Sequence, residues 1–177
     1  ATNCRLEIRE RIIDGSEGYP DTGATISLTT DSIQMSAHHT YRVSGGHAST
    51  ASEGATDTGN SATPDPPSEN QSGWGAEDTL WFVAAAMDNG TRTCDAAPTD
   101  YTNLSQNRAD STQGVTLGTA RRELNAASED PGTFTFNLNE DWVAATIALR
   151  PSGAIPVSNT LATPWESLVP IAATGTT

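Results

Sequence analysis

Carboxylates and two adjacent histidines are the residues of this 177-residue chain whose types could do chemistry. Paired carboxylates are the acid and base of glycosidases, and the candidates here are Glu7, Glu10, Glu129, Asp130, Glu140 and Asp141. Most acidic side chains near turns are simply solvated, so the pattern favours surface residues over a catalytic pair. His38 and His39 point to opposite faces of a strand and cannot hold one ion together. We predict an exposed histidine beside a partly buried one.

The other sequence signals for catalysis are missing. The chain has no G-x-S-x-G elbow, no phosphate-binding loop and no dinucleotide fingerprint. Asp57 to Asn60 and Asp88 to Gly90 are rich in Asp, Asn and Gly, but turn formation explains both without Ca²⁺. We therefore predict no catalytic residue, no cofactor and no metal site, and a protein that is not an enzyme.

Cys4 and Cys94 are the two cysteines of the chain. They have no C-x-x-C spacing and are too few for a metal site of their own. Two readings stay open. The thiols are either separate and unpaired, or joined in one disulfide that ties the first strand to the middle of the chain and indicates an oxidising compartment.

The charge of the chain limits its partners. The net charge is −13, and all nine basic residues are arginines. Such a field repels nucleic acid and anionic membrane surfaces, and it suits a salty or extracellular setting. No apolar run approaches 18 residues, the length needed to span a bilayer. We therefore expect no nucleic-acid and no membrane partner.

Two short apolar runs position everything else: Thr79 to Met87 and Trp142 to Arg150. Each is too short for a core helix and is apolar on both faces, which predicts central strands covered on both sides. Most of the remaining chain alternates polar and apolar residues between turns. The predicted fold is an all-β, antiparallel β-sandwich, jelly-roll-like, of about eight strands within residues 1–151.

Two further strands are expected near the start of the chain. Cys4, Leu6 and Ile8 alternate with charged residues, and a second run places Ile33, Met35, Ala37, His39, Tyr41 and Val43 on one side. Residues 44–70 hold few large apolar groups and are predicted to be a long exposed loop, with 61–68 extended. Tyr101 is expected to pack back over the sheet. Arg121 and Arg122 point to opposite faces, so that one is solvated and the other is a candidate for an ion pair.

Residues 152–177 depart from the strand pattern. They form an extended tail with apolar side chains at no regular period, and we expect it to dock on its own domain or on a neighbouring subunit. The chain begins at Ala1 rather than Met, which is typical of a processed product or a piece of a longer polypeptide. The candidate assembly contacts are Leu161, Trp165, Leu168, Val169 and Ile171.

Four segments carry a resemblance to a known family: Ala62 to Ser68, Trp74 to Trp81, Ala120 to Phe134 and Trp142 to Pro151. Together they resemble a β-sandwich domain that recurs in tail, fibre and head-surface proteins of tailed bacteriophages. The likeness covers roughly residues 4–151. Family members usually have one or two strands before the position of Cys4, and this chain lacks them. A sandwich short of strands exposes a sheet edge that invites pairing.

The resemblance implies a non-enzymatic structural component on the outer surface of a virion, as a head decoration, fibre or tail appendage. Its expected partners are other virion proteins and copies of itself, with a trimer as one arrangement. A different class stays as the alternative: a glycan-binding module that recognises host-surface sugars. For that reading the candidate sugar contacts are Trp74 and Tyr101.

Overall fold

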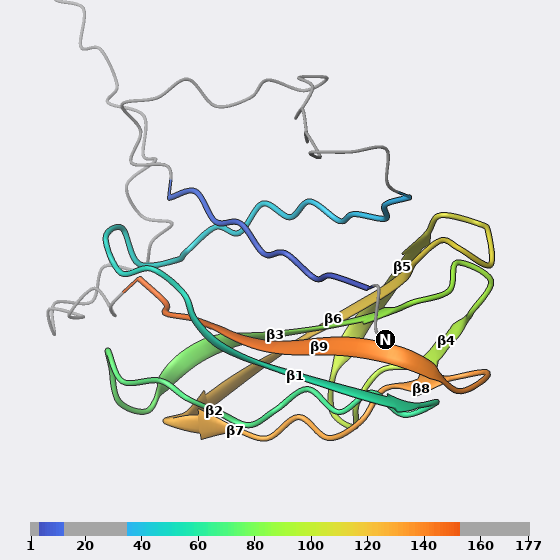
Figure 1. Ribbon diagram of the computed structural model, residues 1–177. Coiled ribbons are helices and arrows are strands. Elements are labelled where there is room, and N and C mark those ends of the chain that lie inside the picture. Colours follow the sequence, from blue (N-terminus) through green and yellow to red (C-terminus); the bar gives the residue numbers. More distant parts are fainter. Residues whose placement is uncertain (1–3, 13–34, 153–177) are drawn as a thin grey trace, which may run out of the picture.

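The two apolar runs form the middle of a five-stranded antiparallel sheet with strand order β1-β9-β3-β6-β5 (Figure 1). β3 lies between β9 and β6, and β9 lies between β1 and β3, so both predicted central strands are confirmed. The structure, a computed structural model, describes residues 4–12 and 35–152. Its nine strands are β1 (Glu53–Ser61), β2 (Glu69–Asn70), β3 (Glu77–Met87), β4 (Cys94–Ala96), β5 (Thr102–Arg108), β6 (Thr116–Ala126), β7 (Ser128–Glu129), β8 (Thr135–Phe136) and β9 (Glu140–Leu149).

The chain is all-β in the described ranges, as the sequence predicts. Two small antiparallel sheets, β2 with β7 and β4 with β8, form a second layer beneath the main sheet (Figure 1). The expectation of an antiparallel β-sandwich is therefore confirmed. Within residues 4–12 and 35–152 no helix is long and apolar enough to cross a membrane.

The aromatic core fills the space between these two layers. Trp81 and Phe134 are 0% exposed, and Trp142 is 6% exposed. Alternation along β3 turns Trp81, Val83, Ala85 and Met87 toward this core, and we call that side of the main sheet the inner face. Complete burial of each large aromatic ring contributes roughly 2–3 kcal/mol, so this layer carries most of the hydrophobic stabilisation.

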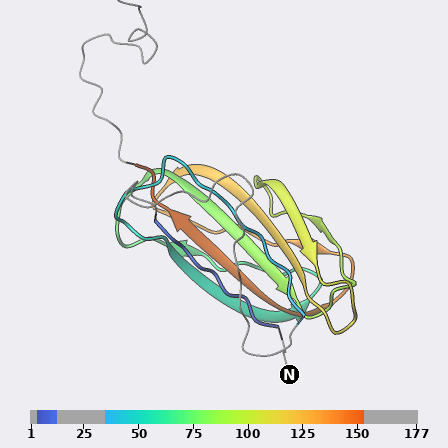
Figure 2. The ribbon, with the colours of Figure 1, turned by 90° about the horizontal axis from the view of Figure 1, so that it is seen from above.

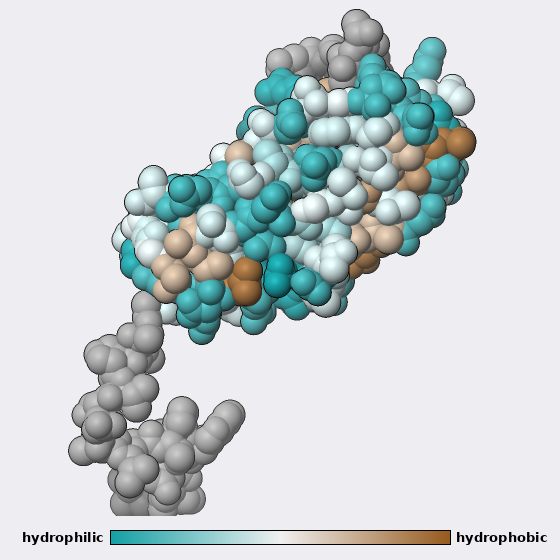
Figure 3. All heavy atoms as spheres, turned by 90° about the horizontal axis from the view of Figure 1, so that it is seen from below, coloured by the Kyte–Doolittle hydropathy of each residue, from teal (hydrophilic) through white to brown (hydrophobic). Residues whose placement is uncertain are grey.

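Prolines shape the second layer. Pro64 and Pro66 are fully buried, and the Pro64 carbonyl accepts a hydrogen bond of 2.9 Å from the Phe134 backbone N–H. The Thr146 hydroxyl of β9 donates to the Pro67 carbonyl at 2.6 Å and ties the segment to the main sheet. Proline has no N–H that would need a partner, so it can be buried here while its carbonyl is satisfied. Seen from below, the molecule is mostly hydrophilic (Figure 3).

The opposite side of the main sheet, the outer face, is covered differently. Ala84, Ala86 and Leu117 lie on it, and Cys4, Leu6 and Ala37 pack against them. Residues 4–12 and 35–43 run extended above the sheet (Figures 1 and 2). Neither forms a strand, so the strands predicted for these two segments are wrong within the described residues. Ile33 lies outside those residues.

The prediction of one long loop over residues 44–70 is also wrong, because residues 53–61 form a strand. β1 (Glu53–Ser61) pairs with β9 in unbroken register from Glu53↔Ala148 to Ser61↔Glu140. An edge strand has one neighbour and a solvated side, so it can be built from small and polar residues through backbone hydrogen bonds. Residues 62–68 form no strand, but the carbonyls of Ala62 and Pro64 accept hydrogen bonds from the N–H groups of Phe136 and Phe134, as in an extended segment. The exposure predicted for them is wrong, because Pro64 and Pro66 are buried.

Candidate functional site

An apolar stripe crosses the outer face of the main sheet. The register places Leu80, Phe82, Ala84 and Ala86 of β3 beside Leu149, Ile147, Ala145 and Val143 of β9, all on this face. Only two extended segments lie above it within the described residues, and several of their side chains stay largely in solvent. Ile8 is 46% exposed, Met35 48%, Tyr41 48% and Val43 42%. The outer face is therefore only partly covered by the described residues.

Thr119 of β6 anchors the segment 35–43. Its hydroxyl lies 2.9 Å from His39 Nδ1 and 2.6 Å from the Tyr41 hydroxyl. The Tyr41 ring meets the Phe82 ring edge-on at 4.7 Å between centroids. Partial burial lowers the pKa of His39 below its ordinary value, and the neighbouring His38 lowers it further. A hydrogen bond from the His39 ring to the Gln106 backbone carbonyl acts in the opposite direction and raises it. His38 is exposed and His39 half-buried, as predicted.

The segment 4–12 is anchored at the edge of the sheet. Glu10 Oε2 accepts hydrogen bonds from the Ser52 backbone N–H at 2.9 Å and from the Ser52 hydroxyl at 2.7 Å. Glu7 binds its own neighbours Arg9 and Arg5. The hydrogen bond and the charge of Arg9, with a smaller effect of Arg5, hold the pKa of the Glu7 carboxyl below its usual range. Single hydrogen bonds of this kind hold an extended segment in place without making it part of a sheet.

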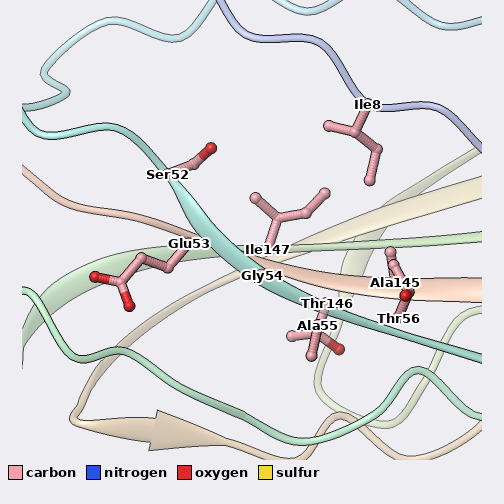
Figure 4. A pocket seen from close by; sticks show the side chains of 9 residues that line it. All are labelled: Ile8, Ser52, Glu53, Gly54, Ala55, Thr56, Ala145, Thr146 and Ile147. Carbon is pink, nitrogen blue, oxygen red and sulfur yellow. The ribbon is translucent and has the colours of Figure 1, made fainter.

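Two hollows remain on the outer face. The first, of about 190 Å³, lies between Ile8 and the strands β1 and β9, with the Ile147 side chain directed toward Ile8 (Figure 4). The second, of about 370 Å³, lies beside Tyr41 and Phe82 and is rimmed by polar groups that include Arg121, Glu123 and Asp78. Both lie where the extended segments leave the sheet uncovered.

The two aromatic candidates for sugar contact lie in the core. Trp74 is 8% and Tyr101 is 7% exposed, and Trp74 Nε1 donates to the Thr79 hydroxyl at 3.0 Å. Burial raises the pKa of the Tyr101 phenol, and the Glu129 carboxylate raises it further. Tyr101 packs over the sheet as predicted. Neither ring presents a face on which a sugar could stack.

The two thiols lie on opposite faces of the main sheet. Cys94 belongs to the aromatic core, whereas Cys4 packs on the outer face, and both are free. Of the two readings left open by the sequence, the disulfide is thus wrong, because the backbone of the main sheet lies between the two thiols. Burial raises the pKa of each thiol to about 12, with Asp88 adding to the effect at Cys4 and Asp95 at Cys94.

The acidic candidates do not converge. Glu129 binds Arg122 at 2.9 Å, and Glu140 binds Arg92 at 3.0 Å. Asp141 accepts from the Asn60 amide. In the parts of the chain that the structure describes, no group of three or more His, Cys, Asp or Glu side chains could hold a metal ion. Of the arginine pair, Arg122 makes the expected ion pair and Arg121 is exposed.

The predicted assembly contacts Leu161, Trp165, Leu168, Val169 and Ile171 lie outside the described residues. Sequence reasoning missed the outer-face residues Ile147 and Gly54. The signal for Ile147 was available, because position 147 alternates with the core residues Ala144, Ala148 and Trp142 and so faces the other side. Gly54 was hidden by the assignment of its segment to a loop.

Comparison with protein-family models, with curated proteins and with solved structures found no match to this chain. The function must therefore be argued from the arrangement of the residues and from the resemblance described above.

Proposed function

We propose that this protein is a non-enzymatic structural component of a bacteriophage virion, exposed on the outer surface and assembled through contacts between subunits. The observation that carries the proposal is the partly covered outer face, where Ile8 lines one hollow, Tyr41 and Val43 line the other, and these three side chains are between 42% and 48% exposed. Exposed apolar groups around surface hollows are typical of interaction sites.

The construction of the sandwich supports the same role. Three of the four segments that carry the resemblance contain or form buried parts of it: Trp74 to Trp81, Ala120 to Phe134 and Trp142 to Pro151. The fourth supplies the buried prolines Pro64 and Pro66. The inner face of the main sheet is thus covered by described residues of the chain itself, whereas the described residues cover the outer face only in part, and in this proposal a neighbouring subunit completes it.

The test locates the protein in purified particles of the phage or prophage whose genome encodes it. Quantitative mass spectrometry should find it at a fixed copy number per particle, and cryo-electron microscopy should place it on the outer surface. Particles that lack the protein, or that contain it in variable trace amounts, would overturn the proposal.

A glycan-binding role is a second candidate, favoured by the hollow beside Tyr41. The exposed Tyr41 ring and the polar side chains of Arg121, Glu123 and Asp78 around the hollow are the kinds of groups that bind sugars. The two candidates expected from the sequence, Trp74 and Tyr101, are buried. A glycan-array signal that is lost on Tyr41→Ala and kept on Leu138→Ala, an exposed site elsewhere, would support it. No binding to any sugar by the wild-type chain would remove it.

A further inference from the structure

The two edges of the main sheet differ in how they are protected. At β5 the register shifts between Thr102 and Ser105, and Asn103 adopts a positive φ of 56°. The Gln106 side chain of the same strand accepts a hydrogen bond from the Cys94 backbone N–H. Such irregularities and side contacts prevent a further strand from pairing. β1 at the other edge has no shift in its pairing with β9 over its whole length.

Hydrogen bonds show which backbone groups of β1, and of Ser52 just before it, point away from the sheet. The Thr58 N–H donates to Asp57 Oδ1 at 2.7 Å, and the Ser52 N–H donates to Glu10 Oε2 at 2.9 Å. Neither N–H is therefore directed at β9. Because backbone groups alternate sides along a strand, Gly54 and Thr56 must also face the free edge. Carboxylates cap the edge at both ends, while between them no described strand other than β9 pairs with β1.

The first hollow lies at this open stretch. Its lining includes Gly54 and Thr56 of the edge, Ile8 above, and Ala145 and Ile147 of β9 (Figure 4). We call these five residues the edge slot. A Cβ at Gly54 would lie 2.8 Å from the Thr146 carbonyl oxygen and 3.6 Å from Ile147 Cγ1, so glycine keeps the apolar floor uncovered. The edge slot thus offers backbone hydrogen bonds and an apolar pocket side by side.

We propose that the edge slot binds an extended segment of residues 153–177 from a second copy of this chain. The segment pairs with the backbone of Gly54 and Thr56 as a short added strand and inserts one apolar side chain between Ile8 and Ile147. The inference rests on the proposed function, because it names the surface through which copies would assemble.

The composition of residues 153–177 fits this occupant. Glu166 is their only charged residue, in a chain whose net charge is −13, so this stretch can approach another copy with little repulsion. It also carries Leu161, Leu168 and Val169 as candidate apolar side chains. Fully extended, it would reach roughly 80 Å at about 3.3 Å per residue, enough to extend to a neighbour.

The direction of β9 favours a neighbour over the same chain. β9 passes the edge slot at Ala145 to Ile147 and ends at Leu149, and the chain continues to Ser152, whose N–H donates to the Gly45 carbonyl at 2.7 Å. The chain has then moved roughly 16 Å past the slot, at about 3.3 Å per residue. To fill its own slot, the following segment would have to reverse its direction.

The first experiment measures self-association of the full chain by sedimentation. Thr56→Pro removes an outward N–H without breaking the pairing with β9, and Ile8→Asp places a charge in the slot. Each should weaken association at least tenfold while the circular dichroism spectrum stays unchanged. Thr58→Pro is the matched control, because that N–H is already used by Asp57, and it should associate like the wild type. Equal association of all four chains would overturn the proposal.

The second experiment identifies the occupant. Full chains with Thr56→Cys are mixed with full chains carrying Leu161→Cys, Leu168→Cys or Val169→Cys, and are oxidised. A disulfide between two different chains is expected for at least one pair. A chain that carries both Thr56→Cys and one of the other cysteines is oxidised beside them, at high dilution. No bridge in any mixed pair, or a bridge found only inside the doubly substituted chain, would overturn the inference. The proposed function fails separately, through absence of the protein from particles.

Discussion

The Arg122 guanidinium of β6 lies 2.9 Å from the Glu129 carboxylate of β7 and connects the main sheet to the second layer. The Glu129 side chain is only 6% exposed, and Arg122 also approaches Asp100 at 3.5 Å. A buried carboxylate without its cation retains the cost of leaving water. This pair therefore makes the position of the short strand β7 depend on a residue of the main sheet.

Arg122→Met should destabilise the fold by about 2–4 kcal/mol, because it leaves Glu129 buried without a partner. Urea unfolding at neutral pH measures the change. Arg121→Met, at the exposed neighbouring position, should stay within about 0.5 kcal/mol of the wild type. Adding Glu129→Gln to Arg122→Met should recover part of the loss, and equal stability of the three variants would contradict this account.

Gly118→Ala should cost about 1–3 kcal/mol, because its Cβ would lie 2.9 Å from the Cys94 sulfur in the closely packed core. Cys94→Ala in the same chain makes room, so the double variant should lose less than the sum of the two single changes. Thermal unfolding of the wild type, the two single variants and the double variant gives the coupling free energy between the two positions. Strict additivity would show that Cys94 does not restrict position 118.

Both thiols should react slowly in the folded protein, because burial raises the pKa of each to about 12. Alkylation at pH 8 should modify neither in native buffer and both in urea, as read by intact mass. Thiol burial also affects stability at high pH. The contribution of the buried, protonated thiols to the free energy of unfolding is complete below the unfolded pKa near 9.0. It is lost as the pH rises toward the folded pKa of about 12. Fast modification of native protein would contradict the assignment.

His39 should make the fold sensitive to mild acid. The folded pKa of His39 lies below the unfolded value near 6.5. The contribution of the neutral ring to the free energy of unfolding is therefore present above pH 6.5 and is lost as pH falls through the folded pKa. Chemical unfolding between pH 7.5 and 5 should therefore show a steeper loss for the wild type than for His39→Gln. His38→Gln, at the exposed neighbour, should follow the wild type.

Deletion of Leu161 to Thr177 should leave the sandwich folded and abolish assembly. Circular dichroism and urea unfolding test the first part, and incorporation into particles tests the second. A truncated chain that still co-purifies with its particle at full occupancy would show that assembly uses another surface.

The interior of the sheet could be predicted from the sequence, and both of its edges could not. Strands such as β3 and β9 are buried on two faces and require continuous apolar runs. β1 and β5 each have one neighbour, and their sequences EGATDTGNS and TNLSQNR contain almost no large apolar residue. Their pairing depends on backbone groups that every residue carries, so composition gives little signal.

The converse error occurred at the start of the chain. Residues 4–9 and 35–43 alternate like strands, and Leu6, Ala37 and His39 do turn toward the sheet. Alternation reports that one side of an extended segment is covered, but not that its backbone is paired. The candidate site could not be predicted because it combines Ile8, Gly54 and Ile147, which only the fold brings together.

The separation of Cys4 and Cys94 by a sheet has a consequence for the response of the fold to redox conditions. Because the two thiols lie on opposite faces and are not joined, the cohesion of the sandwich comes from packing and hydrogen bonds. Urea unfolding should therefore have the same midpoint with and without a reductant.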